Sequence, residues 1–167
     1  NQWGLPLSLA RMPVDSEFGI FEMGMNHTGE IAHLAALARP HLAVITNVEA
    51  AHLAFFNSEQ DIAIAKAEIF QGLDRGGKVL LNCDNRHFQH LQLLAERRDI
   101  TKIYSFGSQK TAEFRLLDCK LTASGSDVRV SVMGDIFEYR VGTPGRHWVQ
   151  NSLAVIGCAY LLGADPS

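Results

Sequence analysis

The chain has 167 residues, of which 47% are hydrophobic and 20% charged, a composition typical of a globular domain with a real core. The formal net charge of −3 does not favour binding to nucleic acid or to an anionic membrane surface, and no apolar run approaches the roughly 20 residues of a membrane span. The three cysteines are odd in number and widely spaced, which favours free thiols in a cytoplasmic protein over a disulfide framework. The chain starts at Asn1 and ends in Asp-Pro-Ser, so we expect it to be a piece of a longer protein.

The first two thirds of the chain predict helices that alternate with buried strands. A short helix at 5–12 is ended by Pro13, and the apolar run at 18–23 is typical of a buried strand. Apolar residues recur at helical spacing through 29–38. Further along we expect a strand at 42–46, a helix at 59–73 capped by Ser58, a strand at 78–81, a helix at 87–97 and a strand at 102–106. This order indicates a parallel sheet covered by helices.

The pattern changes in the last third of the chain. Three short strands at 114–121, 128–133 and 136–141 are separated by tight turns, which predicts an antiparallel meander. A helix at 148–162 follows and is ended by Gly163. The fold class expected is therefore α/β, with a mostly parallel sheet flanked by helices and a small antiparallel β-meander. The expected divisions are a parallel part at 1–107, antiparallel strands at 108–142, and a loop with the final helix at 143–167.

Polar side chains gather where the first two expected strands end. Glu22 closes the first apolar run, with Asn26 and His27 just beyond it, and Asn47 and His52 follow the next strand. In open α/β sheets ligands bind at the carboxyl ends of the strands. Oxygen-rich groups there suit a hard cation such as Mg²⁺ and the phosphates that accompany it. For Glu22 alone, a solvated carboxylate is an equally simple explanation. For His27 alone a capping or loop residue, and for His52 alone a satisfied, partly buried histidine, is the simpler explanation.

Lys66 lies on the apolar stripe of its expected helix, because Ile62, Ile69 and Phe70 stand four residues before it and three and four after it. A lysine there must reach solvent with its end or meet a specific partner. Reaching solvent is the common outcome. A lysine with a lowered pKa can instead act as a nucleophile, take up CO₂ and become a carbamate, an anionic metal ligand.

Two other segments bear on phosphate binding. The segment 72–78 matches the first seven positions of a phosphate loop, but Val79 replaces the required Ser or Thr and the segment leads from helix into strand, so we reject it. At the start of the final helix, Arg146, His147 and Asn151 could meet a nucleotide, since an amide suits a purine edge. An ordinary helix start is the simpler explanation of this second segment.

Together these segments resemble the central, ATP-binding domain of the Mur ligases, which build the peptide of the peptidoglycan precursor. The matching segments follow the family's order along nearly the whole chain: GLPLSL at 4–9, EMGMNHTGEI at 22–31, NVEAAHL at 47–53, AKAEIF at 65–70, NCDN at 82–85 and PGRHWVQN at 144–151. The block at 26–31 favours the branch that adds D-alanyl-D-alanine over those that add earlier amino acids.

The resemblance implies an ATP-dependent acid–amino-acid ligase of cell-wall synthesis that joins D-alanyl-D-alanine to UDP-N-acetylmuramoyl-tripeptide through an acyl phosphate, using ATP and Mg²⁺. It implies that Glu22 binds one Mg²⁺, that His52 binds a second, and that Lys66 is carbamylated and bears on that metal. Lys66 and His52 would be the catalytic residues. The remaining implied contacts are to the nucleotide, with Asn151 against adenine, Arg146 and His147 nearby, and Asn26, His27 and Asn47 lining the same cleft.

The sequence departs from the family pattern at two places. Ala54 stands where the family has Glu, and Asn57 where it often has Gly. The larger departure is an absence, because the family's phosphate loop would lie before Asn1. We therefore expect residues 1–167 alone not to turn over ATP, and to self-associate to cover a sheet edge left without its strand. Two alternatives stay open: another amide ligase of the folylpolyglutamate or cyanophycin synthetase kind, and a non-catalytic scaffold domain.

Overall fold

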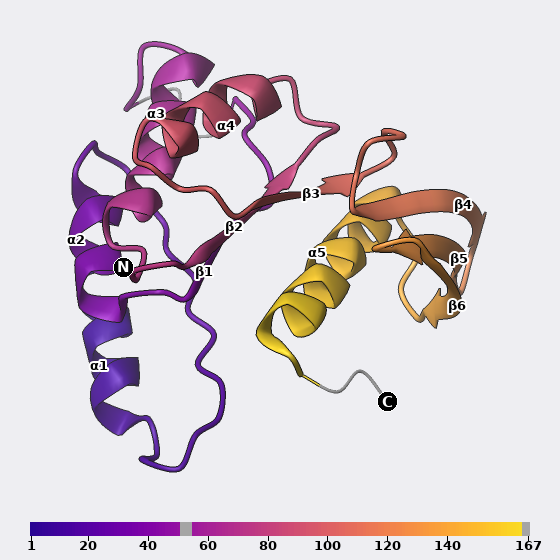
Figure 1. Cartoon of the computed structure of the whole chain (residues 1–167), viewed down its shortest axis with the longest axis horizontal. Helices are drawn as coiled ribbons and strands as arrows, with labels where there is room; N and C mark the ends of the chain where they lie inside the picture. Colours follow the sequence, from indigo (N-terminus) through magenta and orange to yellow (C-terminus); the bar gives the residue numbers. More distant parts are fainter. Residues whose placement is uncertain (51–54, 165–167) are drawn as a thin grey trace.

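The computed structural model describes residues 1–50 and 55–164. Its central feature is a six-stranded mixed sheet (Figure 1). Its strands lie side by side in chain order: β1 (Leu42–Ile45), β2 (Lys78–Asn82), β3 (Ile103–Gly107), β4 (Phe114–Thr122), β5 (Gly125–Val132) and β6 (Asp135–Val141). The pairs from β1 to β4 are parallel, and those from β4 to β6 are antiparallel. The α/β fold with an antiparallel meander expected from the sequence is confirmed.

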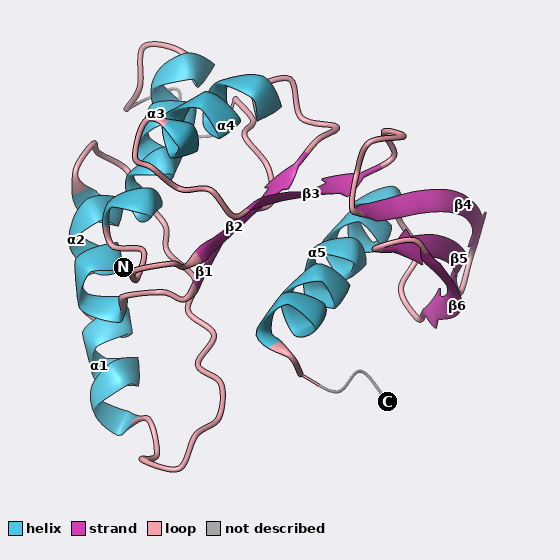
Figure 2. Ribbon diagram, viewed as in Figure 1, coloured by secondary structure: helices cyan, strands magenta, loops and turns pink. Residues whose placement is uncertain are grey.

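Helices cover both faces of the parallel part of the sheet (Figure 2). On one face lie α3 (Glu59–Ala67), the 3₁₀ turn η1 (Glu68–Gln71) and α4 (Phe88–Glu96), with α2 (Glu30–Ala38) packed on η1 and α1 (Gly4–Arg11) beside α2. The long helix α5 (Arg146–Leu162) lies against the other face. No helix in the described ranges is long and apolar enough to cross a membrane.

Successive side chains of β2 point alternately into the two hydrophobic clusters of the described chain. Val79 and Leu81 point into the cluster under α3 and α4, whereas Leu80 points into the cluster under α5, and all three are fully buried. A strand buried on both faces reads as a continuous apolar run, as β2 does. Gly157 lets α5 approach closely, because a Cβ there would lie 2.8 Å from a methyl carbon of Leu80.

The strand expected at 18–23 is wrong. The segment is irregular, β1 is the edge strand of the described sheet, and no backbone hydrogen bond joins the two in the described ranges. Ile20 is 95% exposed and Phe18 47%. An apolar run favours burial, but a strand also needs a partner for its N–H and C=O groups, and here it has none among the described residues. Within the described residues, the parallel sheet therefore begins at β1.

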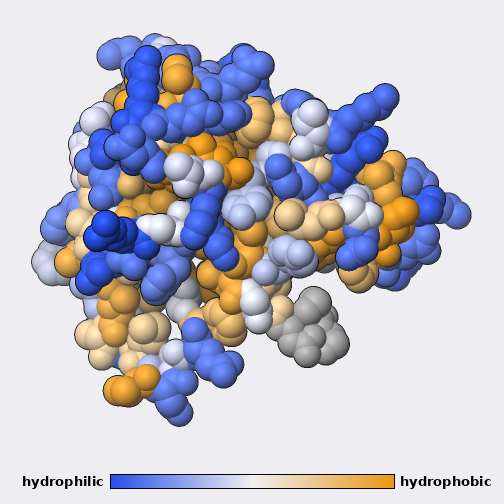
Figure 3. Space-filling model, in the orientation of Figure 1, coloured by the Kyte–Doolittle hydropathy of each residue, from blue (hydrophilic) through white to orange (hydrophobic). Residues whose placement is uncertain are grey.

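Apolar side chains remain at the surface around α1 and the segment after it (Figure 3). Trp3 is 80% exposed and Val14 fully so, while Leu5 is the buried residue of α1. This part of the chain therefore contributes little to the core.

Helix α3 is shorter than the helix expected at 59–73. Ser58 caps it as expected, with its Oγ accepting a hydrogen bond from the backbone N–H of Asp61 at 3.2 Å. After Ala67 the backbone tightens into η1, which packs so closely on α2 that a Cβ on Gly72 would lie 2.2 Å from the Ala35 carbonyl. The rejected phosphate-loop segment is the turn into β2, and its Lys78 donates a hydrogen bond to the carbonyl of Leu161 at the end of α5.

Candidate functional site

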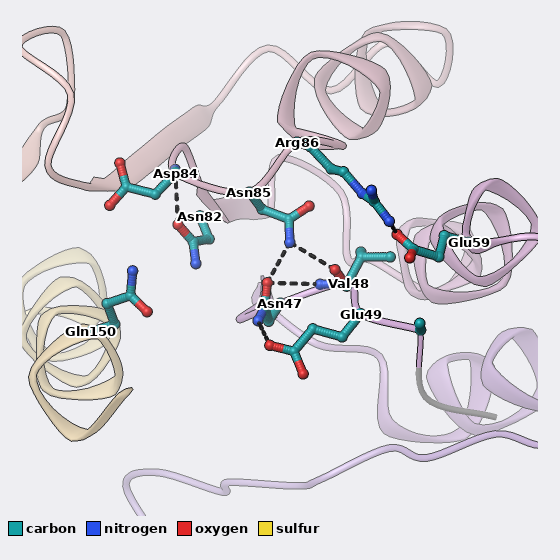
Figure 4. Close-up of a pocket in the computed structure, with 10 residues that line it drawn as sticks. Asn47, Val48, Glu49, Glu59, Asn82, Asp84, Asn85, Arg86 and Gln150 are labelled. Atoms are coloured by element: carbon teal, nitrogen blue, oxygen red, sulfur yellow. Dashed lines mark hydrogen bonds and ion pairs between the residues drawn. The ribbon is translucent and has the colours of Figure 1, made fainter. Parts of the chain in front are cut away.

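A polar cleft of about 400 Å³ lies at the carboxyl ends of β1 and β2 (Figure 4). Its walls come from the segment after β1, the turn after β2, the first residue of α3 and one residue of α5. The lining residues are Asn47, Val48, Glu49, Ala50, Glu59, Asn82, Asp84, Asn85, Arg86 and Gln150. This is the edge of the sheet at which ligands bind in open α/β folds, and the edge at which the sequence predicts a site.

Two asparagines join the ends of β1 and β2 across this cleft. The side-chain N–H of Asn82, which is buried, donates to the carbonyl of Thr46 at 2.9 Å, and its Oδ1 accepts from the backbone N–H of Asp84 at 2.9 Å. The side-chain N–H of Asn85 donates to Oδ1 of Asn47 and to the carbonyl of Val48, the latter at 2.9 Å. Buried amides that find partners for their donors stabilise one geometry. The two loops therefore form a single cleft wall.

The turn after β2 is tied in the same way to the loop after β3. The Asp84 carboxylate accepts from the backbone N–H of Ser108 at 2.8 and 3.0 Å and from its hydroxyl at 2.9 Å. The side chain of Gln109 donates to the carbonyl of Cys83. Three successive strand ends are thus held together by side chains.

Glu59, which lines the cleft, interacts with the side chains of Arg86 and His87. It forms an ion pair with the guanidinium of Arg86, and Nε2 of His87 lies 3.2 Å from its Oε2. Burial of the His87 ring, and secondarily the positive charge of Arg86, lower the pKa of this imidazole. The neutral ring is therefore favoured at pH 7, where its N–H can donate to Glu59.

Lys66 lies half-buried on α3, where the charges of two carboxylates act on it. Burial lowers the pKa of its ammonium group, and the negative charges of Glu22 and Glu49 act against this shift. Glu22 is exposed on the irregular segment before α2, and Glu49 lines the cleft. The charge of the predicted residue Glu22 therefore acts on Lys66, and so does that of Glu49, which the sequence interpretation did not select.

The segment with Asn26 and His27 is a capped helix start. Oε2 of Glu30 accepts from the backbone N–H of Asn26 at 2.7 Å and of His27 at 3.3 Å. These hydrogen bonds hold the pKa of the Glu30 carboxyl below its usual range. From the other side, Oε1 of the buried Glu68 accepts from the N–H of Gly29 at 2.7 Å. The side chains of Asn26 and His27 stay exposed, and neither lines the cleft.

The predicted residues at the start of α5 lie apart from the cleft lining. Arg146, His147 and Asn151 are exposed, and it is Gln150, one residue earlier than Asn151, that faces the cleft (Figure 4). His52 and Ala54 lie outside the described residues. Within the ranges 1–50 and 55–164, no group of three or more His, Cys, Asp or Glu side chains is arranged to hold a metal ion.

Sequence interpretation missed most of the cleft wall. Three of the lining residues lie in a motif shared with the family but were given no role: Asn82, Asp84 and Asn85. No sequence pattern pointed to three others, which are Glu59, Arg86 and Gln150. For the first group the signal was present: three polar residues directly after a buried strand, at the same edge as Asn47. For Gln150 there was none, because which side of α5 faces the cleft depends on how the helix packs on the sheet.

The family comparison covers nearly the whole chain. A family model described as the Mur ligase middle domain matches residues 1–159. The UDP-N-acetylmuramoyl-tripeptide–D-alanyl-D-alanine ligase of Rickettsia prowazekii (strain Madrid E) is 33% identical over 165 residues, which are 99% of this chain and 37% of that protein. The enzyme of the same name from Escherichia coli (strain K12) is 32% identical over 165 residues, which are 98% of this chain and 36% of that protein. The chain thus spans little more than a third of these relatives.

Solved structures agree with the sequence comparison. MurF from Acinetobacter baumannii superposes with a TM-score of 0.92 at 25% identity, covering 99% of this chain and 36% of that one. MurF ligase from Thermotoga maritima, in complex with ADP, gives 0.84 at 25% identity, covering 98% and 37%. An L. casei FPGS mutant gives 0.67 at 18% identity over 86% of this chain and 33% of that one, which shows a shared fold alone. From its family match, relatives and fold, this chain belongs to the Mur ligase family, whose middle domain it matches over residues 1–159.

Proposed function

We propose that the longer protein containing this chain is an ATP-dependent ligase that joins D-alanyl-D-alanine to UDP-N-acetylmuramoyl-tripeptide. The observation that carries the proposal is the 33% identity over 99% of the chain with a relative of that name. The ADP complex of the Thermotoga maritima relative supports a nucleotide site in this domain. The polar cleft at the carboxyl edge of the sheet supports the same assignment.

The proposed reaction has two steps. The terminal carboxylate of the tripeptide attacks the γ-phosphorus of ATP, which gives an acyl phosphate and releases ADP. The amine of D-alanyl-D-alanine then attacks the acyl carbon, phosphate leaves with the bonding electron pair, and the ammonium proton is released as the amide forms. Both steps bring anionic groups together, so the domain must hold them in line and balance their charge.

The described donors fit a hard divalent cation. Carboxylate oxygens are ligands that Mg²⁺ prefers, and Glu22 and Glu49, whose charges act on Lys66, supply them. Bound there, Mg²⁺ would neutralise charge between the attacking carboxylate and the γ-phosphate. Glu22 and a carbamylated Lys66 are the proposed ligands from the described residues, and His52 is a further one outside them.

Lys66 is suited to carbamate formation because burial lowers its pKa. A lower pKa leaves more of the amine neutral near pH 7, and only the neutral amine can attack CO₂. The new N–C bond forms from the nitrogen lone pair, and one proton is released to solvent. The product is an anion at a fixed place on α3, where an ammonium group stood before.

The start of α5 is the proposed place for the adenine. Asn151 would pair with its edge, and Arg146 and His147, all three exposed, would lie beside it. Gln150 on the same helix turn faces the cleft (Figure 4). A nucleotide that spans from this helix to Lys66 would pass along the part of the cleft wall that Asn47, Asn82 and Asn85 form.

The test is an amide-forming assay on the full-length protein. UDP-N-acetylmuramoyl-tripeptide, D-alanyl-D-alanine and ATP are supplied, and ADP and the extended peptide are followed by mass spectrometry. The proposal predicts product only when both peptide substrates are present. Glutamate in place of D-alanyl-D-alanine is the matched control, and product with glutamate and a folate acceptor instead would contradict the proposal.

A further inference from the structure

Asn85 stands at the centre of a chain of hydrogen-bonded side chains in the cleft wall (Figure 4). The backbone N–H of His87 donates to its Oδ1 at 2.9 Å, and its own amide donates to Oδ1 of Asn47. The amide of Asn47 in turn donates to Oε1 of Glu49 at 2.6 Å. The chain therefore runs from the turn after β2 to a carboxylate on the segment after β1.

We propose that Asn85 is a positioning residue of this site, which acts through Asn47 to hold the Glu49 carboxylate in the cleft wall. The inference rests on the proposed function, because there this cleft takes the metal–nucleotide complex. It adds a role for three residues, Asn85, Asn47 and Glu49, that act as one unit.

Backbone groups fix the direction of every amide in this unit. Asn85 can face its oxygen only toward the N–H of His87 and its nitrogen only toward the carbonyl of Val48, since these backbone groups cannot exchange roles. Asn47 is fixed in the same manner, because its Oδ1 also accepts from the backbone N–H of Val48 at 3.1 Å. The nitrogen of Asn47 is therefore left to face Glu49.

Glu49 is the residue of this unit whose position the fixed orientation of Asn47 affects. One of its oxygens is engaged by Asn47, so the carboxylate is held at a fixed place in the wall. Its charge acts on Lys66, as that of Glu22 does from the other segment. A carboxylate that is held by a hydrogen bond needs less reorganisation when it meets a cation than one that is free to rotate.

The substitution Asn85→Asp tests the unit directly. The new carboxylate keeps the acceptor for the N–H of His87 but presents an oxygen to Oδ1 of Asn47. Because this contact between two oxygens is repulsive, we expect the Asn47 amide to turn, to give up its hydrogen bond from the backbone N–H of Val48 and to offer its own oxygen to Glu49. In the full-length protein we expect the apparent KM for Mg²⁺–ATP to rise by about tenfold, as for other groups that orient a metal-binding carboxylate. Glu49→Gln alone should also raise this KM, because it removes the charge.

The double variant Asn85→Asp with Glu49→Gln separates positioning from general damage. The new amide at position 49 can donate to the turned Asn47, so the proposal predicts that the double variant regains at least about threefold in KM over Asn85→Asp alone. Asn82→Asp is the matched control: it adds the same charge at the same cleft, but Asn82 bonds to Thr46 and not to Asn47. Its effect should add to that of Glu49→Gln.

The outcomes distinguish this inference from the proposed function. If the wild-type protein forms the amide and Glu49→Gln is equally harmful in the wild-type and Asn85→Asp backgrounds, the positioning role is overturned. If the wild-type protein forms no amide, the proposed function fails. In that case the free energy of unfolding of the same variants is measured in urea. A larger coupling energy between positions 85 and 49 than between 82 and 49 supports the unit, and equal coupling energies overturn it.

Discussion

The carboxylate of Glu68 and the backbone N–H of Gly29 form a hydrogen bond of 2.7 Å that joins η1 to the start of α2. The second oxygen of Glu68 accepts from the N–H of Ala32 at 3.3 Å. Glu68 is 6% exposed and lies two residues after Lys66. Two of the sequence segments shared with the Mur ligases are therefore one structural unit, in which the capped start of α2 is fixed against the helix that carries Lys66.

Removal of this buried cap should destabilise the fold. Glu68→Ala leaves two N–H groups at the start of α2 without their acceptor, and we expect the free energy of unfolding to fall by about 2 to 3 kcal/mol. Urea unfolding followed by circular dichroism measures the change. Glu138→Ala, which removes a largely exposed carboxylate from β6, is the control and should cost no more than about 0.5 kcal/mol.

The carboxylates beside Lys66 should control its reactivity. The charges of Glu22 and Glu49 raise the pKa of Lys66, so Glu22→Gln should lower this pKa further. The midpoint of its labelling by acetic anhydride would then move to lower pH. Mass spectrometry reads Lys66 and the exposed Lys120 in the same sample, and Lys120 should not change. An unchanged or higher midpoint for Lys66 would show that the charge of Glu22 does not act on this lysine.

The same lysine should make stability depend on pH. Its pKa in the folded chain lies below the ordinary value of 10.5, so between these two values the unfolded chain binds more protons than the folded one. The free energy of unfolding should therefore rise with pH through this window. Lys66→Met should flatten the rise, and a slope equal to that of the wild type would show that Lys66 does not cause it.

Close packing of η1 on α2 predicts a large effect from a single methyl group. In Gly72→Ala the new Cβ meets backbone atoms of Ala35 at 2.2 Å, so the two elements must separate, at a cost of about 3 kcal/mol. Gly142→Ala is the matched control, since a Cβ there has no neighbour within 4 Å. Equal losses of stability for the two variants in thermal unfolding would contradict this packing.

Hydrophobic periodicity was sufficient to predict most of the secondary structure. Strands β2 and β3 and helix α5 were predicted from apolar patterns, which reflect their burial in the core. The tight turns at 124–125 and 134–135 separate the strands of the meander. The segment 18–23 shows where this reasoning stops. Its apolar residues favour a strand, but whether a neighbouring strand is present is not written in the segment itself.

The chemistry of the site was only half visible in the sequence. The offsets around Lys66 showed that a cation lies on an apolar stripe, and in the structure this lysine is half-buried and feels the charge of Glu22. The partners of Asn85 could not be predicted, because its hydrogen bonds reach Asn47 and Val48, 38 and 37 residues away. Such contacts depend on which strands are neighbours, and a local pattern does not record that.

Amide formation by the full-length Lys66→Ala variant tests the central claim most directly. If Lys66 supplies a carbamate to the metal site, the variant should lose ligase activity by about a hundredfold or more, and acetate or formate should restore part of it by replacing the missing carboxylate. Lys120→Ala is the control for loss of an exposed lysine. Full activity of Lys66→Ala, without any added carboxylate, would contradict the account.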